Sequence, residues 1–417
     1  MKILLKVLKW IGIIISTLLL TLIAVGGIYF SLDTHLPKPT GKYEVGVTYR
    51  RVQTTRNINY NNFADSNRVI YLKIWYPAQV NTDSKKVRTP FIEGGATTGE
   101  QFFEDPQLWH SIAINQAVKV KTNSFVDLPI IDGKFPIVTY SHGYSQWSSD
   151  NTTLMESLAS KGFVVVSISH TPQVLYAPIS HDAVIISEVI TLSDIQTDTA
   201  EYRRHREKYT TLQTQEELNA YHLYGRKFSS GLSADLWSDD IVTAIQYMKQ
   251  TQHISTDFFF QKLDTTKVGS VGFSMGGSAA VNATLKDSSI CAAINMDGGL
   301  AGDFLHQRPD ADILFLTGLR RLPASNVTIS HFGNFKDKNN QHYPTLMIEG
   351  AMHANFTDLN SISILLKWMG ILGQVDSQFM IEQKNLIIHD FLTASFHQKP
   401  FDANQYEIKD KVINFDY

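Results

Sequence analysis

Short strand-like runs alternate with helix-like segments over most of the chain, and this alternation limits its possible folds more than any other feature. Six runs have the composition of buried strands: residues 136–140, 163–168, 268–272, 292–296, 313–317 and 345–349. Helix-like segments lie between them at residues 152–161, 240–249 and 275–285. Continuous apolar runs are typical of strands covered on both faces, and strand–helix–strand repetition implies crossover connections. We therefore predict an α/β protein, with a mostly parallel central sheet and helices on both faces.

The rest of the chain is predicted to belong to the same domain, which spans residues 45–417. Residues 45–53 and 69–75 have strand composition, and residues 385–391 are predicted to form a helix. A long insertion at about residues 171–236 carries charged, helix-like stretches. Insertions of this length between sheet elements often cover a binding site, so a helical cap is predicted there. Alternatively, the charged stretches of this insertion form solvated surface helices.

The composition excludes several classes of protein. Hydrophobic residues make up 43% of the 417 residues, which fits a globular chain and not a disordered one. The 37 Lys+Arg and 40 Asp+Glu residues give a net charge of -3, so the chain lacks the basic excess that nucleic-acid binding requires. Cys291 is the only cysteine, which excludes an internal disulfide and a cysteine-based metal site.

The N-terminal segment is predicted to be a membrane anchor. Residues 10–30 form a stretch of 21 residues without Asp, Glu, Lys or Arg, long enough to cross a bilayer as a helix. The flank at residues 1–9 carries three lysines, so the positive-inside rule places it in the cytoplasm and the main domain outside. Residues 31–44 are then a linker. The alternative is a signal peptide cleaved near residues 24–26, which would give a secreted protein.

The first candidate site is a glycine-rich turn between a predicted strand and a helix of small residues, Gly272-Phe273-Ser274-Met275-Gly276-Gly277. This G-x-S-x-G pattern, in that context, predicts a nucleophile elbow. Small neighbours allow the sharp turn that lifts the serine hydroxyl above the sheet edge. The N-terminal end of the following helix then points at the hydroxyl and stabilises negative charge. An ordinary glycine-rich turn is the alternative.

A serine nucleophile needs a base and a third group that orients the base. On a sheet of this kind the carboxylate and then the histidine follow the serine, each after a later strand. Asp297 directly follows the run 292–296, and His353 follows the run 345–349 through a short loop. We therefore predict that Ser274, Asp297 and His353 form a catalytic triad.

Neighbouring acidic and histidine residues fit these roles less well. Asp303 and Asp310 do not directly follow a strand, and Asp312 precedes one. His331 and His342 precede the last predicted strand, so they are expected at the opposite end of the sheet.

The oxyanion hole is predicted to use two backbone N–H groups. One belongs to Met275, the residue after the nucleophile, and the other to Tyr144 in the loop after the run 136–140. His142 in the same loop is expected to hold the loop in place instead of acting as a second base. His170 is given no chemical role.

At these motifs the chain resembles the α/β-hydrolases of the plasma-type platelet-activating-factor acetylhydrolase family, with dienelactone-hydrolase-like and polyester-hydrolase-like enzymes as relatives. The resemblance covers roughly residues 67–360 and rests on five motifs: 74–78 (IWYPA), 140–143 (YSHG), 272–277 (GFSMGG), 296–297 (MD) and 350–358 (GAMHANFTD). It implies the triad Ser274, Asp297 and His353, with oxyanion donors at Tyr144 and Met275. The chain departs from the family pattern at Tyr144 and in the insertion at 171–236.

The resemblance implies hydrolysis of short or oxidised acyl chains from phospholipids, as by 1-alkyl-2-acetylglycerophosphocholine esterases, with no calcium or other cofactor. An esterase for soluble or polymeric esters is the first alternative, and a non-catalytic hydrolase fold used for binding is the second. A metal-dependent hydrolase is disfavoured, because the 14 histidines show no H-E-x-x-H spacing. The expected partners are an ester or phospholipid substrate and, through the N-terminal helix, a membrane.

Overall fold

The computed structural model describes most of the chain. The described residues are 2–31, 34–54, 58–60, 63–65, 68–79, 86–100, 115–144, 146–186, 229–305, 307–318, 343–362 and 365–415, with a few between 200 and 224 and between 336 and 341.

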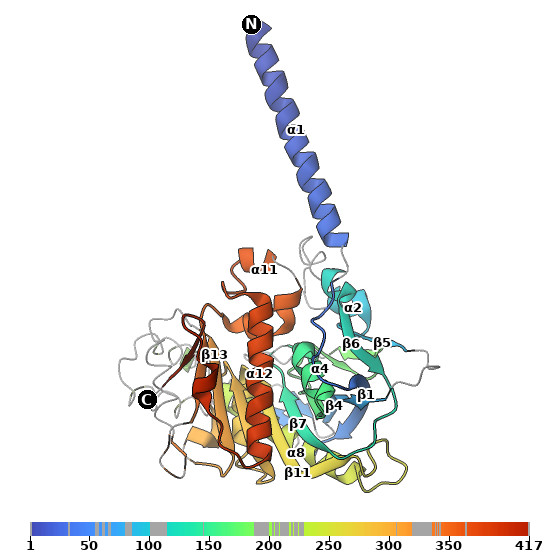
Figure 1. Ribbon diagram of the computed structural model, residues 1–417, viewed down its shortest axis with the longest axis vertical. Helices are drawn as coiled ribbons and strands as arrows, with labels where there is room; N and C mark the ends of the chain where they lie inside the picture. The colour runs from blue at the N-terminus through green and yellow to red at the C-terminus, as the bar shows by residue number, and fades with distance from the viewer. Residues whose placement is uncertain are drawn as a thin grey trace.

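The N-terminal segment is helical. Helix α1 spans Lys2–Ser31, and Figure 1 shows it projecting away from the rest of the protein. Its described apolar side chains, among them Trp10 and Leu20, are exposed. Nevertheless, among the helices that the structure describes, none combines the length and apolarity needed to cross a membrane. The transmembrane span predicted at residues 10–30 is therefore not supported by the structure.

An 11-stranded sheet forms the centre of the protein, in the order β15-β14-β13-β12-β11-β7-β8-β4-β1-β6-β5. In chain order its strands are β1 (Glu44–Gln53), β4 (Val69–Ala78), β5 (Arg88–Pro90), β6 (Lys121–Val126), β7 (Phe135–Ser141), β8 (Val164–Ser169), β11 (Leu263–Phe273), β12 (Ile290–Met296), β13 (Asp312–Gly318), β14 (Thr345–Ile348) and β15 (Val412–Asn414). The six neighbouring strands from β14 to β8 are all parallel. The predicted mostly parallel sheet is thus confirmed.

Helices cover both faces of this sheet. Helices α4 (Thr152–Ser160) and α12 (Ser377–Phe396) lie on one face, in front of the sheet in Figure 1. Helices α8 (Ser229–Thr251) and α9 (Met275–Ala283) pack on the other. Side chains on β8 alternate between these two cores: Val165 joins the α4–α12 side, whereas Val164 and Val166 join the α8–α9 side. This explains why four of the six residues of the strand are apolar, including neighbours that face opposite sides.

Several elements extend or add to the sequence-based prediction. Helix α12 is longer than the predicted 385–391, and the strands β5, β6 and β15 near the two ends of the sheet were not predicted. In the predicted cap range, the structure describes a hairpin of β9 (Tyr176–Pro178) and β10 (Val184–Ile186), and α8 already begins at Ser229. Most of the charged stretch between residues 187 and 228 lies outside the described residues.

A buried polar network links α4 to α12. The Tyr140 hydroxyl donates to Asp150 Oδ1 (2.7 Å), and the Asn151 side-chain amide donates to the Tyr140 oxygen (2.6 Å). Lys384 donates to Asn151 Oδ1 (2.5 Å) and to the carbonyl of Phe356 (3.2 Å). The network therefore fixes the chain just after His353 to both helices.

The carboxyl group of Asp150 makes this network sensitive to pH. Burial raises the pKa of Asp150 to about 7, so the folded protein favours its protonated form at lower pH. An unfolded aspartate has a pKa of about 3.9. The folded value is the higher one, so the contribution of Asp150 to stability is complete below about pH 4 and is lost as the pH rises to about 7.

We predict that Asp150→Asn removes this dependence. From pH 4 to pH 7 its free energy of unfolding should rise relative to wild type by at most about 1.4 kcal/mol per pH unit, and it should level off above pH 7. Urea unfolding at pH 5, 6, 7 and 8 measures the difference. Exposed Glu407→Gln is the control and should track wild type. A constant difference between Asp150→Asn and wild type over this range would contradict the account.

Candidate active site

Ser274 lies on a sharp turn between β11 and α9, as the motif predicts. Its backbone has φ 55° and ψ −119°, and its N–H donates to the carbonyl of Met296 on β12 (2.9 Å). A positive φ is costly for a residue with a side chain, by about 1–3 kcal/mol, and such residues concentrate at functional sites. The observed conformation is that of the sharp strand-to-helix turn that the motif predicts.

The elbow requires glycine at two positions. A β-carbon at Gly272 would lie 2.0 Å from the carbonyl oxygen of Gly276. A β-carbon at Gly276 would lie 2.1 Å from the carbonyl oxygen of Ser141, at the end of β7. Both contacts are with backbone atoms that cannot move aside without moving a strand or helix. The first turn of α9 therefore packs directly onto the loop after β7.

The three residues predicted as a triad form a continuous chain of contacts. His353 Nε2 lies 2.9 Å from Ser274 Oγ, and His353 Nδ1 lies 2.5 Å from Asp297 Oδ2. His353 is exposed, whereas the side chain of Asp297 is fully buried. A buried carboxylate that accepts from Nδ1–H leaves Nε2 free to accept the serine proton. This is the geometry expected of a nucleophile, a base and a carboxylate that orients the base.

Asp297 is held by the next strand as well as by His353. Its Oδ1 accepts hydrogen bonds from the Thr317 hydroxyl (2.9 Å) and from the Gly318 N–H (3.1 Å) at the end of β13. The backbone of Asp297 also has a positive φ, 51°. Sequence analysis missed Thr317. Its position at the end of the strand beside β12 is the signal that would have indicated it.

The loop that carries His353 is fixed by an asparagine. Helix η3 (His353–Phe356) follows β14, and the side-chain oxygen of Asn355 accepts from the Met352 N–H (2.8 Å) and the Gly373 N–H (2.7 Å). The ring of His353 also packs on Phe273, with ring centroids 4.6 Å apart. These contacts set the position and the ring plane of His353.

The predicted oxyanion loop lies beside the elbow. A β-carbon at Gly143 would lie 3.0 Å from the ring of Phe273, which directly precedes Ser274. The neighbouring Tyr144 packs parallel to Trp237 on α8, at 6.3 Å between ring centroids. This arrangement places the loop near the site, while the donor roles of the Tyr144 and Met275 N–H groups stay a prediction.

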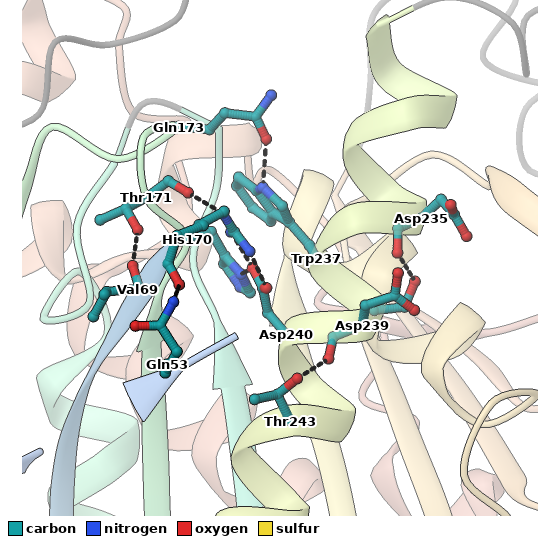
Figure 2. Close-up of polar contacts among 12 residues, drawn as sticks. Gln53, Val69, His170, Thr171, Gln173, Asp235, Trp237, Asp239, Asp240 and Thr243 are labelled. Atoms are coloured by element: carbon teal, nitrogen blue, oxygen red, sulfur yellow. Dashed lines mark hydrogen bonds and ion pairs between the residues drawn. The ribbon is translucent and has the colours of Figure 1, made fainter. Parts of the chain in front are cut away.

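His142 and His170 are both fully buried, and neither contacts the triad. Burial and the nearby His170 lower the pKa of His142 to about 3, so its ring is neutral. His142 Nδ1 lies 2.7 Å from the carbonyl of Gly143, which agrees with the predicted loop-holding role. His170 contacts Asp240 on α8, and Figure 2 shows the two side chains facing each other. Sequence analysis gave His170 no role.

Two of the competing acidic residues, Asp303 and Asp312, lie away from the triad. Asp312 begins β13, at the end opposite to Thr317 and the triad. Asp303 lies in the short helix Gly302–Leu305, where its N–H donates to the side chain of Asn282. His331 and His342 lie outside the described residues.

Comparison with known proteins places the chain in a family. Residues 28–414 match the family model described as platelet-activating factor acetylhydrolase, isoform II. The chain belongs to this family.

Two curated relatives agree with this assignment, and one solved structure shares the fold. The platelet-activating factor acetylhydrolase of Cavia porcellus is 23% identical over 390 residues, which cover 90% of this chain and 79% of the relative. The enzyme of the same name from Canis lupus familiaris is 22% identical over 381 residues, covering 89% and 79%. A ferulic acid esterase from Streptomyces cinnamoneus superposes with a TM-score of 0.65 at 16% identity, over 92% of this chain and 100% of that chain. This last likeness supports an α/β-hydrolase fold.

We predict that Thr317→Val lowers kcat on a short-chain nitrophenyl ester by roughly 10–100-fold. The Thr317 hydroxyl orients Asp297, and hydrogen bonds that orient metal ligands in the same way have effects of this size. Valine keeps the shape of threonine but cannot donate to Asp297. The matched control is Thr284→Val, which removes a similarly buried hydroxyl that bonds the carbonyl of Val281 at the far end of α9. Equal kcat values for the two variants would contradict the role of Thr317.

Proposed function

We propose that the protein is a serine carboxylic-ester hydrolase that works through an acyl-enzyme on Ser274. The observation that carries the proposal is the unbroken contact chain from Ser274 through His353 to Asp297. The exposed His353 and the partly exposed Ser274 leave this chain open to a substrate.

The geometry supports a two-step reaction. Ser274 Oγ attacks the ester carbonyl carbon while its proton passes to His353 Nε2, and the buried Asp297 stabilises the imidazolium. The N–H groups of Tyr144 and Met275 bind the tetrahedral oxyanion. Collapse expels the alcohol, which takes the proton from His353 and leaves the acyl group on Ser274. Water then attacks the acyl-enzyme by the same proton transfers and releases the carboxylic acid.

Ser274→Ala tests this chemistry. The variant should lose at least about 10³-fold in kcat on a short-chain nitrophenyl ester, because the nucleophile is gone and only binding and oxyanion contacts remain. Ser278→Ala, four residues further along on α9, is the control and should keep activity within a few-fold. Retention of most of the activity by Ser274→Ala would refute the proposed mechanism.

We further propose that the preferred substrates are phospholipid-like esters with a short or oxidised acyl chain. The family assignment supports this choice. A second support is a group of exposed apolar side chains in the segments next to His353, namely Met352, Trp368, Met369 and Ile371. The chain just after Ile371 packs on the His353 loop, since the Gly373 N–H bonds Asn355. Apolar patches rimmed by polar residues are typical of sites that meet lipids or proteins.

A substrate panel tests this specificity. Phosphatidylcholines with acetyl, butyryl and palmitoyl groups at the second position, presented as micelles, are compared with soluble nitrophenyl esters. The acetyl phospholipid should give the highest kcat/KM, and the palmitoyl phospholipid the lowest of the three. Activity confined to soluble esters would favour the alternative of an esterase for soluble or polymeric substrates.

For localisation we propose an uncleaved anchor at residues 10–30, with the catalytic domain outside. The support is the sequence alone: 21 residues without a charged side chain and three lysines before them. The proposal predicts an intact mass that includes residues 1–30 for the protein purified from membranes. A mature chain that starts near residue 27 would instead indicate a secreted protein.

A further inference from the structure

Helix α8 contacts the oxyanion loop through one aromatic side chain. The ring of Trp237 stacks on His170 at 4.2 Å between centroids, with 6° between the ring planes, and also lies parallel to Tyr144. Its indole N–H donates to Gln173 (2.6 Å), as Figure 2 shows. All of Trp237 is buried. One side chain of α8 thus touches both a buried histidine and the residue proposed as an oxyanion donor.

Asp240, one turn further along α8, makes a second connection. Its Oδ2 lies 2.8 Å from His170 Nδ1, and its carboxylate accepts two hydrogen bonds from the guanidinium of Arg68. His170 Nε2 in turn lies 3.0 Å from Ser141 Oγ. Arg68 and Asp240 are only 1% exposed, and His170 and Ser141 are fully buried. The trio Ser141, His170 and Asp240 resembles a triad in its contacts, but a substrate has no access to it.

The contacts determine which nitrogen of each histidine carries a proton. Burial acts to raise the pKa of Asp240, but the Arg68 charge and the hydrogen bonds outweigh it and lower the pKa, so Asp240 is ionised. His170 therefore donates from Nδ1 to Asp240. The His170 backbone N–H points at His142 Nε2 (3.4 Å), which must accept. The proton of neutral His142 is then on Nδ1, and it is donated to the Gly143 carbonyl.

This donation orients the peptide that carries the proposed oxyanion donor. The Gly143 carbonyl also accepts from the Gln146 N–H (3.1 Å), so two donors hold its oxygen. In a trans peptide the carbonyl and the next N–H point in opposite directions. With the Gly143 oxygen held by His142 and Gln146, the Tyr144 N–H must face the other way. A flip of this peptide would break both bonds.

We propose that Asp240 and Trp237 are positioning residues for the oxyanion hole. Through His170 and His142 they hold the Gly143–Tyr144 peptide so that the Tyr144 N–H keeps the direction needed to bind the tetrahedral intermediate. The proposal rests on the proposed ester hydrolysis at Ser274. It assigns a functional role to α8, which begins inside the predicted cap range.

The test replaces the buried ion pair as a unit, Arg68→Met with Asp240→Leu, so that no buried charge is left without a partner. His170 then has no acceptor for its Nδ1 proton. The expected result is a roughly 10–100-fold loss of kcat with KM within about 2-fold of wild type, the size seen for supporting hydrogen bonds around a site. The matched control is Asp239→Leu with Lys286→Met, a partly exposed pair that joins the same helix to the chain just after α9, which should keep both constants within 2-fold.

A transition-state analogue distinguishes a positioning role from a general loss of stability. An alkyl trifluoromethyl ketone accepts Ser274 Oγ at its carbonyl carbon, the serine proton moves to His353, and the ketone oxygen becomes an oxyanion. Its inhibition constant should weaken by the same factor as kcat/KM. A merely structural role would lower the melting temperature and leave this constant unchanged, and that result would overturn the proposal.

A milder variant covers the case in which the double replacement does not fold. Trp237→Leu keeps the ion pair but removes the ring that contacts Tyr144 and His170, and it should show the same selective loss of kcat and inhibitor affinity. A wild-type protein without ester hydrolysis would overturn the proposed function and this role with it. An active wild type together with fully active Asp240 and Trp237 variants would overturn this role alone.

Discussion

The close packing of Gly276 against the carbonyl oxygen of Ser141 is the contact on which the site depends. A side chain at position 276 would force α9 away from β7, because a β-carbon there would meet the Ser141 oxygen at 2.1 Å. With glycine, the first turn of α9 and the loop after β7 meet at one edge of the sheet. The nucleophile on one element and the proposed oxyanion donor on the other are thereby brought together before any substrate binds.

Parallel strands bring the remaining groups to the same edge. Strands β11, β12, β13 and β14 run in one direction, so the residues that follow them gather at their carboxyl ends. Ser274, Asp297 and His353 could be predicted from the sequence for this reason: each follows an apolar run, and the order along the chain restricts the choices. The same reasoning excluded Asp312, which lies at the other end of its strand. Local pattern and strand direction were sufficient for the triad.

Contacts between distant buried polar groups could not be predicted in this way. Arg68 and Asp240 are 172 positions apart in the chain, and nothing in the residues around either one indicates the other. Strand β15 has only three residues, and only its pairing with β14 makes it recognisable as a strand. Thr317 was missed because a threonine in a strand is ordinary, and its role comes from its position beside Asp297. In each case the role depends on a neighbour in the folded structure that the sequence does not show.

The part of the chain that the structure describes contains two Ser–His–Asp contact sets, one open at the sheet edge and one buried against α8. Nucleophilic chemistry is assigned to the first alone. Labelling the full-length protein with a fluorophosphonate and mapping the modified peptide by mass spectrometry distinguishes them directly. The account predicts a single adduct on Ser274 and none on Ser141. An adduct on any other residue, or no adduct while a known serine hydrolase is labelled in parallel, would contradict it.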